Sequence, residues 1–157
     1  MNVTQPPTPR VANPADASSV ARLLDAFNRE YGDPTPGPEV LEQRLARLLA
    51  GDSVIAVLAG DQPVGVALLT LRPNVWYDGL VGLLDELYVV PGMRRCGHGS
   101  ALLKATEAVA RERGAELMEI NVDGEDGDAR RFYERHGYAC MAPGEPEPDL
   151  YYSRELR

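Results

Sequence analysis

The sequence feature that most constrains the fold is a turn with two glycines between a predicted strand and a predicted helix. The strand covers 82–90 and the helix 99–113, and the turn carries Arg94, Gly97 and Gly99. The first backbone N–H groups of a helix have no partner inside the helix, and the helix dipole places partial positive charge there. Glycine lets the backbone approach a ligand closely because it has no Cβ. The turn therefore predicts binding of an anion such as a diphosphate.

Two familiar phosphate-binding motifs do not match this turn. A dinucleotide-binding G-x-G-x-x-G fingerprint would need glycine at position 102, which is Leu102, and the G-K-[S/T] of a Walker A loop is absent. Arg95, next to Arg94, adds a second cationic donor for phosphate oxygens. Taken alone, the pattern leaves one alternative open, in which Gly97 and Gly99 only shape a tight connection between a strand and a helix.

The other elements are predicted from hydrophobic periodicity and from the positions of glycine and proline. In chain order they are a strand at 8–12, a helix capped by Asp16 or Ser18, a second helix ending at Gly51, strands at 53–60 and 63–73 joined by the turn 60–62, the strand and helix already described, a strand at 115–122, a helix at 127–136, and strands at 138–141 and 149–155. This order predicts an α/β fold, called α+β in some schemes, with a mixed central sheet flanked by helices. We expect a single domain over 1–157, with 1–7 as a loose N-terminal tail.

Charge and composition exclude several function classes. The chain carries 24 acidic and 16 basic residues, a net charge of -8, which disfavours nucleic acid and anionic membrane as partners. It mildly favours a cationic substrate, although the charge also serves solubility alone. Cys96 and Cys140 fit neither a metal site nor a disulfide framework. The N-terminus lacks the features of a secretory signal, and no apolar run is long enough to span a membrane, so we expect a cytoplasmic protein without a metal.

Two motifs together resemble the GNAT acetyltransferase superfamily. The glycine turn matches its motif A, [Q/R]-x-x-G-x-[G/A], at Arg94, Gly97 and Gly99. Downstream, ARRFYERHGY is similar to its motif B, with matches at Ala129, Phe132, Tyr133, Glu134, Gly137 and Tyr138. The two motifs stand in the family's order and are separated by one helix and one strand. The resemblance implies the family's acyl-CoA transferase fold and acetyl-CoA as the acetyl donor, with coenzyme A as product.

The resemblance also implies which residues hold acetyl-CoA. In the family, backbone amides of the motif A turn bind the pyrophosphate, and the pantetheine arm runs beside the end of the preceding strand, where it and the next strand, here 83–90 and 116–122, splay apart. Carried over to this chain, the turn residues are Arg95, Cys96, Gly97, His98, Gly99 and Ser100, and the strand residues are Leu87, Tyr88, Val89 and Val90.

Motif B implies a catalytic acid. Tyr133 matches the tyrosine that protonates the departing thiolate, a role that suits a phenol; the alternative is a buried aromatic packed beside Phe132. Asp126 stands where relatives often have an asparagine that contacts the cofactor arm. A carboxylate cannot donate as an amide does, so its cofactor contact is in doubt, whereas capping of the following helix remains available to it.

Acetylation of an amine requires a group that removes a proton from the ammonium form. Asp85 and Glu86 lie on the motif A strand, and the string LDELYVVP resembles the acidic pair of polyamine-type family members. Because side chains alternate along a strand, only one of the two is expected to face the acceptor cleft, and Glu86 is favoured. The alternatives are a water chain as base or a plain salt bridge. His98 and His136 are badly placed for the role. No Ser-His-Asp set or acyl-enzyme cysteine is apparent, which favours direct transfer in a ternary complex.

The acceptor pocket is predicted to be built by the first two helices with their connecting loop, and by the 72–79 loop. Its candidate wall residues are Phe27, Tyr31, Trp76, Tyr77 and Asp78, aromatics with a carboxylate that suit an amine. The expected activity is acetylation of a primary amine of a small molecule such as a polyamine, an amino acid or an aminoglycoside. Two alternatives stay open: a protein N-terminal or lysine acetyltransferase, and a sensor that binds acyl-CoA without turnover. Relatives are often homodimers, which makes a homodimer a candidate assembly.

Overall fold

The computed structural model describes residues 6–156. Most of the predicted loose tail, residues 1–7, lies outside these residues. The described chain consists of two compact units, one ending at Ile120 and the other beginning at Asn121. The first unit contains β1 (Pro9–Val11), α1 (Ala17–Tyr31), α2 (Pro38–Leu48), β2 (Val54–Ala59), β3 (Gly65–Pro73), β4 (Leu80–Val89), α3 (His98–Glu112) and β5 (Ala115–Ile120), with short 3-10 turns η1 (Pro14–Asp16) and η2 (Pro91–Met93). The second unit contains α4 (Gly127–Arg135).

The five strands of the first unit form one mixed sheet in the order β1-β2-β3-β4-β5. The pairs from β1 to β4 are antiparallel, and β4 and β5 are parallel. Antiparallel β2 and β3 need only the short turn after Ala59, closed by a bond of 3.0 Å from Val64 N to Ala59 O. Parallel strands need a longer crossover, which α3 supplies between β4 and β5. The predicted mixed sheet flanked by helices is therefore confirmed.

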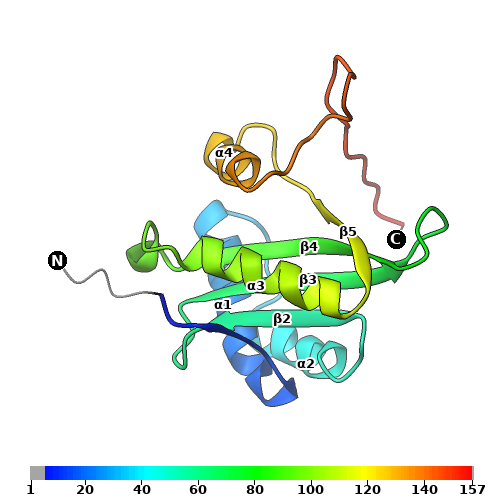
Figure 1. The fold of residues 1–157 in the computed structure, drawn as a ribbon. Coiled ribbons are helices and arrows are strands. Elements are labelled where there is room, and N and C mark those ends of the chain that lie inside the picture. The colour runs from blue at the N-terminus through cyan, green and yellow to red at the C-terminus, as the bar shows by residue number, and fades with distance from the viewer. Residues whose placement is uncertain (1–5, 157) are drawn as a thin grey trace. The chain divides into compact units, whose positions relative to one another are not determined.

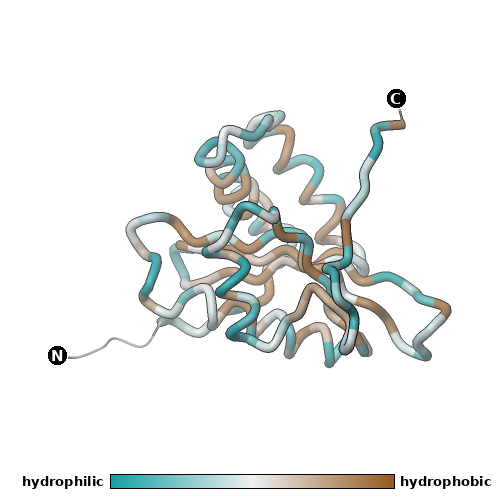
Figure 2. The backbone as a smooth tube through the Cα atoms, turned by 90° about the horizontal axis from the view of Figure 1, so that it is seen from above, coloured by the Kyte–Doolittle hydropathy of each residue, from teal (hydrophilic) through white to brown (hydrophobic). Residues whose placement is uncertain are grey.

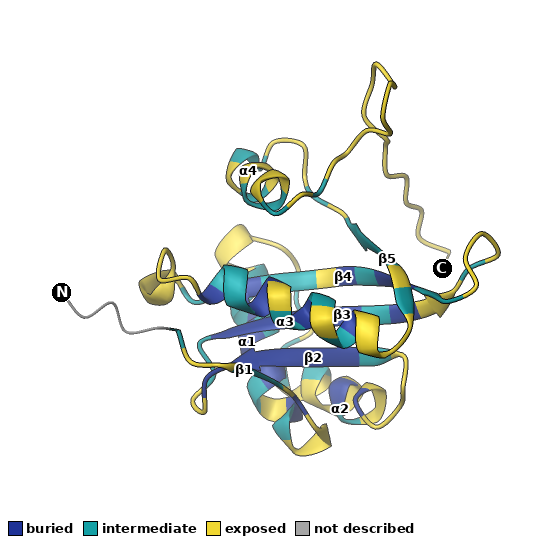
Figure 3. Ribbon diagram, in the orientation of Figure 1, coloured by how far each residue is buried: buried dark blue, intermediate teal, exposed yellow. Residues whose placement is uncertain are grey.

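Helices cover both faces of this sheet. Figure 1 shows α3 crossing one face, with α1 and α2 on the other. Hydrophobic residues follow the strands, and β2 is almost wholly buried (Figures 2 and 3). On α2, Leu45 and the adjacent Leu49 are buried, whereas Val40 and Leu48 are exposed. An i, i+4 stripe is thus the part of α2 that joins the core cluster around α1.

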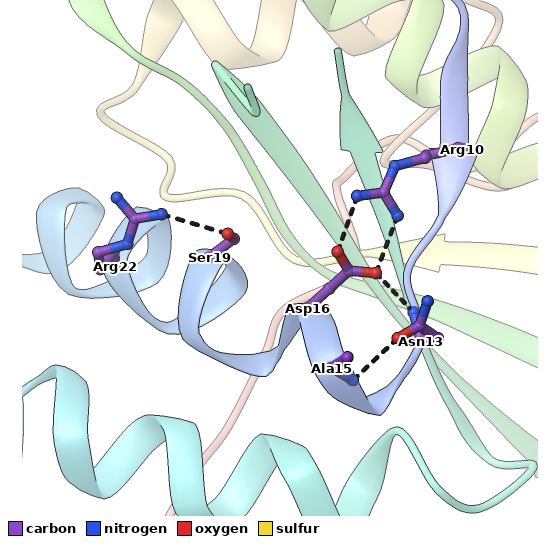
Figure 4. Close-up of polar contacts among 6 residues, drawn as sticks. All are labelled: Arg10, Asn13, Ala15, Asp16, Ser19 and Arg22. Atoms are coloured by element: carbon purple, nitrogen blue, oxygen red, sulfur yellow. Dashed lines mark hydrogen bonds and ion pairs between the residues drawn. The ribbon is translucent and has the colours of Figure 1, made fainter. Parts of the chain in front are cut away.

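The entry into α1 differs from the predicted cap. The side chain of Asp16 does not cap α1, although Asp16 occupies the N-cap position. Instead it accepts a bond of 2.9 Å from Asn13 N and forms a two-bond ion pair with Arg10, at 2.7 and 2.8 Å (Figure 4). Asn13 in turn accepts from Ala15 N at 2.9 Å. These contacts join β1 to the start of α1, and the hydrogen bond from Arg10 lowers the pKa of Asp16 to about 2.

The second unit confirms one helix and corrects two strands. Helix α4 begins after Asp126, whose Oδ1 accepts from Ala129 N at 2.9 Å, as a helix cap does. The predicted strands at 138–141 and 149–155 are wrong, since the described residues there form neither helix nor strand. One backbone bond of 2.8 Å, from Asp149 N to Cys140 O, joins the two segments. Nearly all their side chains are exposed, and the prolines of PGEPEP between them have no N–H for pairing.

None of the helices within residues 6–156 combines the length and the apolar character needed to cross a lipid bilayer.

Candidate active site

Strand β4 contains a bulge at the predicted acidic pair. Leu68 of β3 lies opposite Glu86, and the next residue, Leu69, lies opposite Leu84. Asp85 is therefore an extra residue with no partner of its own on β3. A bulge of this kind bends the strand and re-aims the side chains beside it. An exposed stretch in the middle of β4 marks the same point (Figure 3).

The bulge brings both carboxylates to one face of the sheet, against the prediction that only one would face the cleft. Leu68 packs with the core beneath α1 and α2, so Glu86 opposite it faces that side. Thr70, two residues further along β3, shares this face and donates to Asp85 Oδ2 at 2.5 Å. Strict alternation fails here because the extra residue interrupts the two-residue period.

Burial, together with nearby negative charge, raises the pKa of Glu86. Burial is the main cause that raises its pKa from 4.5 to about 7, followed by the negative charges of Asp85 and Asp33. Burial also raises the pKa of Asp85, although the hydrogen bond from Thr70 acts in the opposite direction. Near neutral pH, Glu86 therefore exists in both protonation states and is suited to take up a proton. Asp33, just after α1, was not predicted; its only signal in the sequence is an acidic residue in the loop between the first two helices.

Two of the predicted acceptor residues lie beside β4. Phe27 of α1 stacks on Tyr88 with ring centres 5.1 Å apart and 18° between the planes. Tyr31, one turn later on α1, meets the edge of Phe27 at 5.3 Å and remains more than half exposed. The ring of Tyr88 thus packs into the α1 side of the sheet, which leaves its main chain for the predicted contact with the cofactor arm.

The structure does not bring the other acceptor candidates to the same place. Trp76, Tyr77 and Asp78 lie in the loop between β3 and β4, at the opposite end of β4 from η2 (Figure 1). The five residue steps from Leu80 to Asp85 span about 17 Å of strand. Trp76 is 85% exposed. Their role in acceptor binding stays a prediction that rests on residue type alone.

The glycine turn has the features of an anion site. Gly97 is the N-cap of α3 and has a φ of 85°, and no side chain of residues 6–156 caps this helix start. The amides that begin a helix of 15 residues are therefore available to a ligand from outside. Arg95 has a φ of 60°, the only positive value for a residue other than glycine among those described. The turn from Pro91 to Gly97 is exposed, as a phosphate-binding loop requires.

The end of β4 offers an open edge for an extended ligand. β4 pairs with β5 only from Leu80 to Leu84, where β5 ends at Ile120, but continues along β3 to Val89. Within this unit, the described residues place no strand along the other side of 85–89. The predicted parting of these two strands is thus present. Leu87 to Val90 have no strand partner on that side, as the fit of a pantetheine arm requires, although Val89 O accepts a hydrogen bond from Arg94 Nε.

Arg94 has partners within the protein. Its Nη1 lies 2.7 Å from Glu30 Oε1, its Nη2 donates to Glu30 Oε2 at 2.8 Å, and its Nε donates to Val89 O at 2.9 Å. All three guanidinium nitrogens are engaged, so the predicted contact with phosphate finds this side chain already held. Arg95, in contrast, forms no ion pair with any described residue. Sequence reasoning missed Glu30 because it lies 64 positions from Arg94.

The remaining turn residues offer a ligand mainly their backbone groups. Cys96 is exposed and its thiol donates to Arg94 O at 3.4 Å. The side chain of His98 is buried, and its Nδ1 has no hydrogen-bond partner among the described residues. Gly99 and Ser100 are half-buried. Within residues 6–156, no three or more His, Cys, Asp or Glu side chains are grouped to hold a metal ion.

The motif B residues belong to the second unit, and their contacts within that unit are as follows. Tyr133 packs edge-on against Phe132, with ring centres 5.1 Å apart, and against Tyr138 at 5.8 Å. His136 Nδ1 lies 2.7 Å from Phe132 O. The aromatic cluster explains how α4 holds the tyrosine.

A helix start open to an anion, an unpaired strand edge and a carboxylate that titrates near neutrality define a site for group transfer from a phosphate-bearing donor. Comparison with known proteins gives the particular family: residues 20–138 match the model of the acetyltransferase (GNAT) family, to which the chain belongs.

Individual relatives agree with this assignment. A candidate acetyltransferase from Arthrobacter sp. FB24, known from a crystal structure, is 57% identical with a TM-score of 0.89, over 94% of this chain and 95% of that one. An aminoglycoside N(6')-acetyltransferase from Stenotrophomonas maltophilia is 32% identical over 87% of this chain and 88% of its own length. An aminoalkylphosphonate N-acetyltransferase from Salmonella typhimurium is 38% identical over 52% of this chain, a match that spans only 53% of that relative.

Proposed function

We propose that this protein transfers the acetyl group of acetyl-CoA directly to a primary amine of a small molecule. The observation that carries the proposal is Glu86, whose pKa of about 7 lies close to physiological pH at the point where β4 parts from β5. A base at that place is what amine acetylation needs, because a free alkylamine is largely protonated near pH 7.

Acetyl-CoA supplies the acetyl thioester. The amides of residues 95–100 bind its diphosphate, and the open edge of β4 at residues 87–90 binds its arm. Glu86 accepts the proton of the ammonium group, and the charges of Asp85 and Asp33 attract that cation. Asp85 or a water molecule is the alternative base. Motif B adds Tyr133 as the acid for the thiolate; Asp126 has a capping role of its own.

The acceptor class follows from charge and from the relatives. The negative charges of Asp33 and Asp85 both act on Glu86, on the side of the sheet where the aromatic rings of α1 lie, which suits a cationic amine. Relatives are named as aminoglycoside and aminoalkylphosphonate N-acetyltransferases, whose acceptors are small amines. A cytoplasmic location and a homodimer remain further proposals that rest on the sequence and the family.

The test is release of free thiol from acetyl-CoA across a panel of polyamines, amino acids, aminoglycosides and aminoalkylphosphonates. We expect turnover with at least one small amine, and a loss of about a hundredfold in kcat/KM for Glu86→Gln, the scale of general base catalysis. Glu112→Gln, which removes an exposed carboxylate of α3, is the matched control and keeps full activity.

Two results would contradict the proposal. Binding of acetyl-CoA without thiol release from any amine would favour a sensor. Turnover with peptide amines alone would favour a protein acetyltransferase. Tyr133→Phe tests the acid separately: unchanged kcat across the pH range would remove Tyr133 from the mechanism.

A further inference from the structure

Glu30, near the end of α1, is bonded to both sides of the cofactor turn. Its two carboxylate oxygens lie 2.7 and 2.8 Å from the two Nη atoms of Arg94, and Oε2 also accepts a hydrogen bond from the hydroxyl of Tyr88 at 3.0 Å. Arg94 is the first residue of motif A, and Tyr88 lies next to the end of β4. One carboxylate on a helix therefore holds the strand before the turn and the turn itself.

The contacts around this carboxylate are of the strong kind. A two-bond pair between arginine and carboxylate fixes both distance and orientation. The guanidinium also lies over the ring of Tyr88, with Cζ 5.6 Å from its centre, and Phe27 stacks on the same ring with the two ring centres 5.1 Å apart. The hydrogen bond from Arg94 is the main cause of a lowered pKa for Glu30. Glu30 is thus charged at any pH at which amines are acetylated.

The turn has few other attachments to the protein. Residues 91–97 are all exposed, so packing contributes little to their conformation. Among the residues the structure describes, their other hydrogen bonds stay close in sequence. They run from Met93 N to Val90 O, from Arg94 N to Pro91 O, from Arg94 Nε to Val89 O, from Cys96 Sγ to Arg94 O, and from Ala101 N to Gly97 O. The same turn holds Arg95 and Gly97 at positive φ, and for Arg95 that conformation is costly. A conformation of this kind persists only where surrounding contacts fix it.

We propose that Glu30 is a positioning residue for acetyl-CoA, acting through Arg94. It does not touch the cofactor; it orders the turn whose amides bind the diphosphate, before the ligand arrives. The entropic cost of ordering the turn is then part of folding rather than of binding, so acetyl-CoA binds more tightly. Because Glu30 shares α1 with Phe27 and Tyr31, the same contact ties the cofactor turn to the helix that lines the proposed acceptor side. This inference rests on the proposed function, since it takes acetyl-CoA as the ligand.

The experiment compares Glu30→Gln with Asp16→Asn. Both remove the charge of a carboxylate that pairs with an arginine through two bonds, and the arginines are similarly exposed, 38% for Arg94 and 40% for Arg10. Calorimetry with coenzyme A and initial rates with acetyl-CoA are measured on each variant. For Glu30→Gln we expect binding and KM for acetyl-CoA weakened about three- to tenfold, the effect of losing one partly exposed charge pair. kcat at saturating cofactor stays within about twofold of wild type, and Asp16→Asn leaves both constants unchanged.

A double-mutant cycle with Arg94→Gln tests the route of the effect. If Glu30 acts through Arg94, adding Glu30→Gln to Arg94→Gln causes little further loss. Glu30→Asp, which keeps the charge but shortens its reach, gives an intermediate loss and guards against failure of the first variant to fold. If Glu30→Gln binds coenzyme A as tightly as the wild type does, or if the losses in the cycle are additive, this inference alone is overturned. Absence of coenzyme A binding by the wild type would overturn the proposed function and this inference together.

Discussion

Replacement of Glu86 by glutamine should change both the stability and the pH profile of the protein. The pKa of Glu86 is about 7 in the folded chain against an ordinary 4.5, so the folded state holds the proton more tightly than the unfolded state does. Folding stability therefore falls as pH rises from 4.5 to 7, and the whole penalty is present above 7. At 1.36 kcal/mol per pKa unit the penalty is about 3 kcal/mol at most, and partial exposure reduces it to about 1–2 kcal/mol.

Glu86→Gln removes that penalty. Urea unfolding at pH 8 should show the variant more stable than wild type by about 1–2 kcal/mol, whereas at pH 4.5 the two should agree within about 0.5 kcal/mol. The kcat/KM of wild type should rise with pH through a break near 7, and Asp85→Asn should move this break to lower pH because the charge of Asp85 contributes to the raised pKa. The titration of the amine itself persists in every variant. Equal stability of Glu86→Gln and wild type at pH 8, or a break near 7 that survives in the variant, would refute this account of the base.

Two further predictions concern the glycine turn and the ion pair at the start of α1. Gly97→Ala and Gly114→Ala each place a Cβ on a residue with φ near 85°, at a cost of about 1–2 kcal/mol in stability. Only Gly97→Ala should weaken coenzyme A binding, by about tenfold or more, in calorimetry; equal binding by the two variants would disprove the role of the turn. Asp16 has a folded pKa of about 2 against an ordinary 3.8, so its contribution is present above about 3.8 and lost as pH falls through 2. Asp16→Asn should cost about 1 kcal/mol at pH 7 and almost nothing near pH 2, as measured by urea unfolding; a constant cost would exclude the ion pair as its source.

Much of the fold follows from local patterns in the sequence. The strand, turn and helix from Leu80 to Glu112 are marked by an apolar run, by Pro91 and Gly97, and by helical spacing of leucine and alanine. Each signal acts within a few residues, so the sequence alone locates it. The exception is the C-terminal region, where Leu150, Tyr151 and Tyr152 within 149–155 suggest a strand but none is formed, because a strand also needs a partner.

The candidate site depended more on contacts between distant residues. Asp85 and Glu86 could be recognised as acidic residues on the motif A strand, but the bulge that places both on one face is a matter of register with β3. Register is decided by pairing over the whole strand and leaves no local sign. The pair of Glu30 and Arg94 likewise joins segments that pattern analysis treats one at a time.

The bulge in β4 also makes the chemistry of this site depend on the length of the strand. Leu84 and Glu86 already lie opposite consecutive residues of β3, Leu69 and Leu68. Deleting Asp85 would therefore leave an uninterrupted ladder, with the same fold and one carboxylate in place of two. In this strand, the presence or absence of one residue separates a site with two carboxylates from a site with one on the same fold. Most sheets accept such a change of length only in their loops. Under the proposed function, a change of length at this position would alter the negative charge that meets the amine while the core stays the same.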